Sequence, residues 1–261
     1  TEIYTLSLHD ALPISNVINM DGVEWRRRKW GPVARAWFWM NDWAGCWLGD
    51  HLVADHPQIR RHLETRVRSA KITTIPYGAD HVAEADPAPL ASLGLAQDPY
   101  AVLIARAEPE NSILEVVRAW SRRRRGARLV VLGNYARGHA YQEAVRAAAS
   151  DEVMFPGAIY DQDLVQTLRF HARFYVHGHQ VGGTNPSLVE ALGAGNAVLA
   201  HDNRYNRWVA GPESRYFTTE EECSAAVGDL LARPEALRQM AAASRRRHAE
   251  AFTWPRILHD Y

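Results

Sequence analysis

Short apolar runs alternate with amphipathic segments along almost the whole chain. The apolar runs are bounded by Gly, Asn, Asp or Pro, which is typical of buried strands. The segments between them repeat apolar residues every three or four positions, as helices with one buried face do. Strands are predicted at residues 16–22, 50–56, 71–80, 100–106, 127–134, 152–159, 173–179 and 196–202, with a further extended stretch at 214–219.

Helices are predicted between these strands. In the first of them Ala36, Met40, Trp43 and Trp47 share one face, at spacings of four, three and four. Strands and helices at this cadence predict an α/β protein with doubly wound parallel sheets, whose ligands bind outside the carboxyl ends of the strands. The predicted helices cover residues 31–49, 57–67, 111–123, 138–150, 161–172, 185–195, 219–233 and 234–252.

One stretch interrupts the alternation. Residues 81–99 are rich in Ala, Pro and Asp and have no steady period. We interpret residues 83–97 as a linker between a first domain at 16–82 and a second domain at 98–247, with a C-terminal helix at 248–261 that crosses back to the first domain.

Composition narrows the function classes. The chain has 261 residues with 30 basic and 30 acidic side chains, so no net charge draws it to nucleic acid. Cys46 and Cys223 lie far apart and form no metal-ligand spacing, which favours a reducing, cytoplasmic location. No apolar run is long enough for a membrane span.

The most informative loop is HGHQVGGTNPSLVEALGAGNAVLAHDN, residues 177–203. A strand ends in a Gly-rich turn, and Asn185 and Pro186 then open a helix. Free backbone N–H groups at such a helix start, together with the helix dipole, suit a phosphate. Glu190 lies one turn further on, where a carboxylate can accept hydrogen bonds from sugar hydroxyls. The alternative is an ordinary Gly-rich turn followed by an N-terminal helix carboxylate.

Two other loops follow predicted strands. In ARAEPENS, Arg106 is suited to a bidentate contact with a second face of a phosphate, although a solvated arginine is the simpler interpretation. FPGAIYDQD offers backbone groups to a flat base, and its Asp161–Asp163 pair is better explained as a helix cap than as a metal ligand.

In this order the segments ARAEPEN, VLGN, FPGAIYDQDLVQTL and VGGTNPSLVEALGAGNAVLAHD resemble the donor-binding domain of retaining GT-B glycosyltransferases of the group 1 type. NMDGVEWRRRKWG and HGHQVGGTNPSLVEA resemble more closely a rhamnosyltransferase-like branch that builds bacterial surface polysaccharides. The resemblance covers nearly all of residues 16–261. It implies two Rossmann-like domains, with the donor held by the second.

The resemblance also implies roles for individual residues. Arg106 matches a phosphate-contacting arginine, and Glu190 matches a carboxylate that binds the nucleotide ribose. Backbone groups near the start of the 185–195 helix would hold the diphosphate, and the loop at 157–159 would contact the base. The donor-binding residues expected in this way are Arg106, Asn111, Gly133, Gly157, Ala158, Ile159, Gly182, Gly183, Thr184, Asn185, Ser187, Leu188 and Glu190.

The chain departs from the family pattern at three positions. Gly182 stands where a glutamate commonly approaches the donor sugar, Asn111 replaces the lysine that accompanies the arginine, and Asp21 replaces a strand-end histidine. Asp21 is expected either to act as a carboxylate on the sugar or acceptor or to cap a turn. His177 and His179 lie beside the diphosphate loop, where they either replace the lost side chains or belong to the core. We expect Asp21, His179 and Glu190 to be the catalytic residues.

The resemblance therefore implies transfer of a sugar, with rhamnose as a candidate, from a nucleotide-diphospho-sugar to a polysaccharide or lipid-linked acceptor. Retention of configuration and independence of metal or other cofactors are expected. The alternatives are a non-catalytic fragment that binds nucleotide-sugars, a GT-B epimerase, which would need more acid and base groups, and a phosphorylase, which would need a well-placed lysine.

An aromatic and basic segment remains. Arg26, Arg27, Arg28 and Lys29 precede a run of tryptophans, six of which lie between residues 25 and 47. We interpret the tryptophans as packing within the first domain. For the basic cluster an acceptor, a donor phosphate and the inner face of an anionic membrane all remain candidate partners.

The first fifteen residues fit neither a helical nor a strand period, and they make a poor signal peptide. TEIYTLSLHDALPI resembles a translated short-read sequencing adapter. We therefore exclude residues 1–15 from the fold, and expect that they pack poorly and that the first domain is truncated at its N-terminal side.

Overall fold

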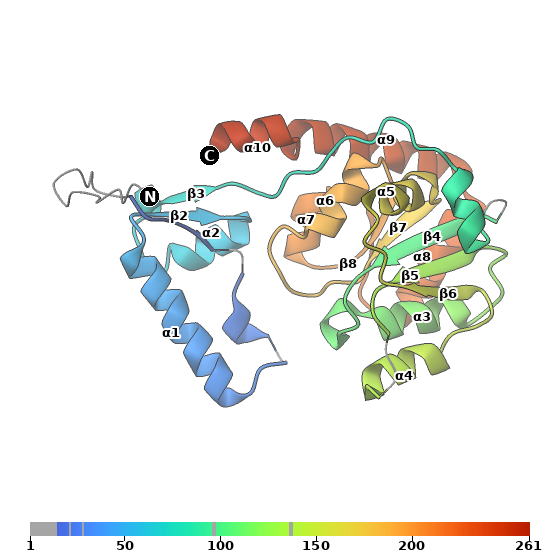
Figure 1. Ribbon diagram of the computed structural model, residues 1–261, viewed down its shortest axis with the longest axis horizontal. Helices are drawn as coiled ribbons and strands as arrows, with labels where there is room; N and C mark the ends of the chain where they lie inside the picture. Colours follow the sequence, from blue (N-terminus) through green and yellow to red (C-terminus); the bar gives the residue numbers. More distant parts are fainter. Residues whose placement is uncertain (1–14, 21, 28, 96–97, 136–137) are drawn as a thin grey trace, which may run out of the picture. The chain divides into compact units, whose positions relative to one another are not determined.

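The computed structural model describes residues 15–20, 22–27, 29–95, 98–135 and 138–261. Its chain divides into two compact units between Ile75 and Pro76 (Figure 1). The expectations for Asp21, Arg28 and residues 1–14 fall outside the described residues.

The first unit is a three-stranded parallel sheet in the order β1-β2-β3. All three strands were predicted. The elements in chain order are β1 (Val17–Met20), η1 (Glu24–Arg26), α1 (Pro32–Leu48), β2 (His51–Ala54), α2 (Pro57–Leu63), η2 (Ser69–Lys71) and β3 (Ile72–Thr74).

The interpretation that the tryptophans pack within the first domain is wrong for Trp47, and the apolar face of α1 that holds Met40 and Trp47 is not its buried face. Met40 and Trp47 are 57% and 69% exposed, whereas Asp42 and Cys46 are buried. Asp42 is buried because its carboxylate has partners within the unit: the buried side chain of Arg66 forms an ion pair with it at 2.5 Å, Trp25 Nε1 donates to it at 3.0 Å and His62 Nε2 lies 3.0 Å away. A period of apolar residues cannot reveal such a paired carboxylate, so it selected the wrong side of the helix.

The second unit is a six-stranded parallel sheet in the order β6-β5-β4-β7-β8-β9. The direction of strand addition reverses between β4 and β7, which is the position where doubly wound sheets bind ligands. The strands are β4 (Tyr100–Ile104), β5 (Arg128–Leu132), β6 (Val153–Gly157), β7 (Phe174–His177), β8 (Val198–His201) and β9 (Arg215–Phe217). The α/β, doubly wound architecture is therefore confirmed, and the extended stretch at 214–219 contains the sixth strand.

Helices cover both faces of this sheet (Figure 1). Side chains alternate between two cores along each central strand: Leu103 faces one core and Val102 the other. The helices are η3 (Ala88–Leu93), η4 (Pro109–Asn111), α3 (Ile113–Ser121), α4 (Ala140–Ala147), α5 (Gln162–His171), α6 (Pro186–Gly193), α7 (Arg204–Ala210), α8 (Glu220–Ala232), α9 (Pro234–Ala251) and α10 (Trp254–Asp260). Of these, η3, η4 and α7 were not predicted.

The stretch predicted as a linker packs on the second unit. Ala79, Leu90 and Leu95 are each at most 3% exposed and belong to one of its two cores. Apolar residues separated by prolines leave no regular period, although they bury as well as periodic ones do. The structural division therefore precedes the predicted 83–97 linker, and the predicted boundary at 247/248 falls inside α9.

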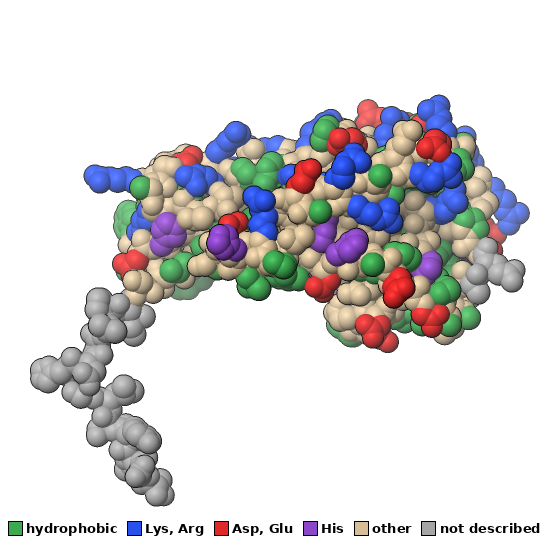
Figure 2. All heavy atoms as spheres, turned by 90° about the horizontal axis from the view of Figure 1, so that it is seen from above, with side chains coloured by type: hydrophobic (Ala, Val, Ile, Leu, Met, Phe, Trp, Pro, Cys, Tyr) green, Lys and Arg blue, Asp and Glu red, His purple; other side chains and the backbone are tan. Residues whose placement is uncertain are grey.

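Charged side chains are mixed on the face of the molecule that Figure 2 shows. Figure 2 shows Lys and Arg side chains (blue) interspersed with Asp and Glu (red) on the visible face rather than gathered in one basic area. Within the described ranges, none of the helices combines the length and apolar character that a membrane span requires.

Candidate functional site

A cavity of about 510 Å³ opens at the carboxyl ends of the strands in the second unit. Its walls come from the loops after β4, β5, β6 and β7 and from the start of α6. Eight of the predicted donor-site and catalytic residues line it: Arg106, Gly133, Ala158, Ile159, His179, Asn185, Ser187 and Glu190.

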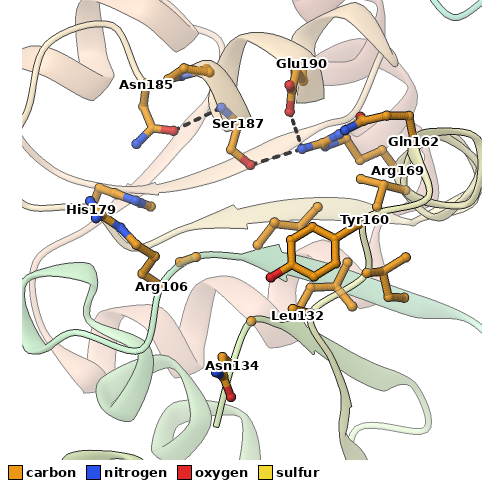
Figure 3. Close-up of a pocket in the computed structure, with 17 residues that line it drawn as sticks. Arg106, Leu132, Asn134, Tyr160, Gln162, Arg169, His179, Asn185, Ser187 and Glu190 are labelled. Carbon is orange, nitrogen blue, oxygen red and sulfur yellow. Dashed lines mark hydrogen bonds and ion pairs between the residues drawn. The ribbon is translucent and has the colours of Figure 1, made fainter. Parts of the chain in front are cut away.

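Arg106 and His179 form one end of this cavity. In Figure 3 their side chains lie near one another, with Asn185 on the same side. Two amides hold the His179 carbonyl from the start of α7, with Asn203 Nδ2 at 2.9 Å and Asn206 Nδ2 at 2.8 Å. A guanidinium, an imidazole and a helix start at one end of a cavity suit an anion.

The loop that carries Arg106 is fastened to the loop that carries His179. Asn111 Nδ2 donates to the Arg106 carbonyl at 2.8 Å, and Gln180 N donates to the Glu110 carbonyl at 2.9 Å. Asn111 is buried and does not line the cavity. Its side chain therefore shapes the Arg106 loop from behind, rather than lying among the lining residues as expected of a donor-binding group.

The start of α6 differs from the expected row of free amides. Asn185 caps the helix: its Oδ1 accepts from Ser187 N at 3.0 Å, and its carbonyl accepts from Leu188 N at 3.1 Å. These two amides therefore already have acceptors, because an asparagine at the N-cap satisfies the first turn of a helix. Leu188 is fully buried, and Gly157, Gly182, Gly183 and Thr184 also do not line the cavity.

Gly133 lines the cavity where β4 and β5 end. An added Cβ there would lie 2.4 Å from the carbonyl oxygen of Ala105, and its φ of +150° disfavours other residues. A side chain at this position would push the β4 and β5 ends apart. Gly133 therefore keeps the floor of the cavity open.

Glu190 and Arg169 form the other polar part of the cavity. Arg169 Nη2 forms an ion pair with Glu190 Oε2 and a hydrogen bond of 3.2 Å with Ser187 Oγ, as the dashed lines in Figure 3 show. Ser187 Oγ also lies 2.8 Å from the Tyr175 hydroxyl. Burial raises the pKa of Tyr175 to about 12, so this hydroxyl keeps its proton at neutral pH.

An apolar wall lies between these polar groups. It contains Ile104, Leu132 and Val165, together with Ala158 and Ile159 from the loop after β6. Tyr160 lies at its edge and is 87% exposed. An apolar wall beside groups that can bind hydroxyls and anions suits a nucleotide.

Sequence reasoning missed several lining residues, of which Arg169 is the most informative. It follows Val165 by four positions, so it lies on the buried side of the amphipathic α5. A charged residue on an apolar helical face is itself a signal of a paired or functional group. The other lining residues that were not predicted are Ile104, Ala105, Leu132, Asn134, Tyr160, Gln162, Val165 and Pro186.

Comparisons with solved structures agree with this fold. Sucrose-phosphate synthase from Thermosynechococcus elongatus superposes with a TM-score of 0.78 at 19% identity, over 96% of this chain and 67% of that one. Anabaena HepE in complex with UDP and glucose superposes with a TM-score of 0.78 at 13% identity, over 93% of this chain and 69% of that one. The pneumococcal O-GlcNAc transferase GtfA in complex with UDP and GlcNAc superposes with a TM-score of 0.69 at 14% identity, over 93% of this chain and 50% of that one.

Family comparisons cover both units. A search of curated proteins found no match. A model described as a domain of unknown function (DUF1972) matches residues 9–80 and so begins inside the segment that resembles an adapter. A model described as glycosyl transferase-like matches residues 111–261, which hold most of the cavity and more than half of the chain. The chain therefore belongs to the glycosyl transferase-like family and has the GT-B fold of its structural neighbours.

Proposed function

We propose that the cavity of the second unit binds a nucleotide-diphospho-sugar and that the protein transfers the sugar to a saccharide or lipid-linked acceptor. The observation that carries this proposal is that three kinds of chemistry share one cavity. Arg106, His179 and the start of α6 offer positive charge at one end, Glu190 offers a carboxylate in the other polar part, and an apolar wall lies between them. These groups suit a diphosphate, a ribose and a base.

The chemistry of transfer follows from the same groups. As the bond between sugar and diphosphate breaks, negative charge grows on the leaving phosphate. Arg106 and the positive end of the α6 dipole would stabilise that charge, which lowers the barrier. We infer transfer with retention, and rhamnose as the sugar, from the family resemblance of HGHQVGGTNPSLVEA. The expectation that no metal or other cofactor takes part stays part of this proposal.

The acceptor side is also a proposal. On α1, Trp37 and Trp47 are 62% and 69% exposed, and Lys29 and Arg35 nearby are exposed as well. Indoles next to cationic side chains suit the interface of an anionic membrane, where a lipid-linked acceptor would lie. Asp21 stays a predicted catalytic carboxylate.

Calorimetric titration with UDP-, GDP-, dTDP- and ADP-sugars tests the donor site. We expect one of them to bind, and Arg106→Met to weaken it by about tenfold or more, because a charge-assisted contact with phosphate is lost. Arg118→Met is the matched control, since Arg118 is exposed on α3 away from the cavity. If none of the four binds the unmodified chain, the proposed function is wrong. Binding without transfer to any acceptor would instead favour a non-catalytic nucleotide-sugar-binding protein.

A further inference from the structure

The carboxylate of Glu190 is held by a buried arginine. Arg169 is 3% exposed, and its side chain reaches from α5 to α6, where it forms the ion pair with Glu190 Oε2. The Glu190 side chain keeps 41% of its surface exposed. One oxygen of the carboxylate is therefore engaged with Arg169, while the group as a whole still faces the cavity (Figure 3).

Arg169 is itself fixed from several sides. Asn196 Nδ2 donates to its backbone carbonyl at 2.6 Å, and Ser187 Oγ accepts from its Nη2 at 3.2 Å. Ser187 lies between Arg169 and the Tyr175 hydroxyl, which also donates to the Ile104 carbonyl at 3.3 Å. The network thus joins α5, α6, β7 and β4 in one wall of the cavity. A long side chain held at both ends loses little further freedom when a ligand binds.

Among the described residues, the Arg169 guanidinium forms its ion pair with Glu190 and donates to the Ser187 hydroxyl. A buried guanidinium without a counter-charge is costly, so the pair has a strong preference for staying formed. The rotamer of Glu190 is therefore selected by Arg169 before any ligand arrives.

We propose that Arg169 is a positioning residue that holds the Glu190 carboxylate in the orientation that binds the sugar hydroxyls of the nucleoside. The inference rests on the proposed function, because it takes Glu190 to contact the ribose. Arg169 acts through Glu190 and leaves the diphosphate to Arg106 and His179. Its loss should consequently weaken binding of a whole nucleoside diphosphate and leave binding of a bare diphosphate unchanged.

The test is a double-mutant cycle measured by calorimetry on the full chain. The probes are inorganic pyrophosphate and whichever of UDP, GDP, ADP and dTDP binds the unmodified chain best. We expect Arg169→Met to lower the affinity for the nucleoside diphosphate by about tenfold, equal to about 1.4 kcal/mol, and to leave the affinity for pyrophosphate unchanged. Glu190→Gln should cause a similar loss, and Arg169→Met should add little in the Glu190→Gln background. Arg169→Lys, which keeps a cation, should recover part of the loss.

Arg173→Met is the matched control, because Arg173 is exposed just beyond the end of α5 and lines neither side of the Arg169–Glu190 pair. If Arg169→Met does not fold, Arg169→Lys takes its place in the cycle. It should cause a smaller loss of nucleoside diphosphate affinity, and no further loss when it is combined with Glu190→Gln. Equal weakening of pyrophosphate, or losses that add in the double variant, would overturn the inference and leave the proposed function standing. Absence of any nucleoside diphosphate binding by the unmodified chain would overturn both.

Discussion

His177 is a titratable residue deep in the second unit that the proposed chemistry does not use. It is 1% exposed at the end of β7, and its ring stacks on that of His179 with 4.3 Å between centroids. Neither of its ring nitrogens has a hydrogen-bond partner among the described residues. Burial, followed by the nearby His179 and His201, lowers the pKa of His177 well below its ordinary value of 6.5. His177 is therefore neutral in the folded protein at neutral pH.

This pKa shift predicts a loss of stability in mild acid. The unfolded chain takes up a proton at His177 near pH 6.5 and the folded chain does not, so the free energy of unfolding falls as the pH drops below 6.5. The slope from one such proton is at most about 1.4 kcal/mol per pH unit. Between about pH 7.5 and 5.5, the free energy of unfolding measured with denaturant should depend less steeply on pH for His177→Gln than for the unmodified chain. His259→Gln, at an exposed position on α10, should leave this pH dependence unchanged. Parallel profiles for His177→Gln and the unmodified chain would contradict this assignment.

At the scale of elements, the cavity depends on two loops that are held together. The loops after β4 and β7 meet where Gln180 bonds to Glu110 and Ser112. The contact is so close that a Cβ added to Gly178 would lie 2.1 Å from the carbonyl oxygen of Asn111. The absence of a side chain at Gly178 is therefore what lets these loops place Arg106 and His179 together.

Gly178→Ala should separate the two loops. The new methyl group meets backbone, which yields less easily than a flexible side chain, so we expect a loss of about 1–3 kcal/mol in the free energy of unfolding. Nucleoside diphosphate binding should weaken as well, because Arg106 and His179 move apart. Gly22→Ala is the control, since nothing lies within 4 Å of a Cβ there. Unchanged stability and binding in Gly178→Ala would show that the loops can shift without cost.

At the scale of the whole molecule, the two hydrophobic cores on either side of the six-stranded sheet consist only of residues from the second unit. The segment before β4 that begins at Pro76, called the strap below, belongs to this unit. His248 Nε2 lies 2.9 Å from the Ala79 carbonyl, and Val82 N donates to the Gly193 carbonyl at 3.0 Å. This strap therefore fastens α9 and the end of α6, the helix that carries Glu190.

A chain of residues 76–261 should accordingly fold by itself with one cooperative transition and bind the same nucleoside diphosphate as the full chain. A chain of residues 98–261, cut after the predicted linker, lacks Ala79, Leu90 and Leu95. Loss of their burial should lower the free energy of unfolding by at least about 3 kcal/mol. Denaturant unfolding measures the free energy of unfolding of the two chains. Equal values would mean that the strap contributes nothing to the stability of the second unit.

Local pattern was enough to predict most of the fold and much of the site. The period of apolar residues identifies strands and helices, and parallel strands bring the loops at their carboxyl ends to one edge of the sheet. For this reason Arg106, His179, Asn185 and Glu190, spread over 85 positions of the printed sequence, could be expected in one cavity. Each lies in a loop after a strand or in the first turns of the helix that follows, so its place depends on topology rather than on detailed packing.

Pairing between distant side chains could not be predicted in this way. Arg169 forms an ion pair with Glu190. Asp42 is buried on α1 because it contacts Trp25 and His62. Asn111 does not line the cavity and donates to the Arg106 carbonyl instead. Residues 83–97, which have no period, still bury Leu90 and Leu95. The physical reason is the same in each case: periodicity records only whether a position favours water, whereas a buried charge or an irregular strap depends on a partner that the three-dimensional fold supplies.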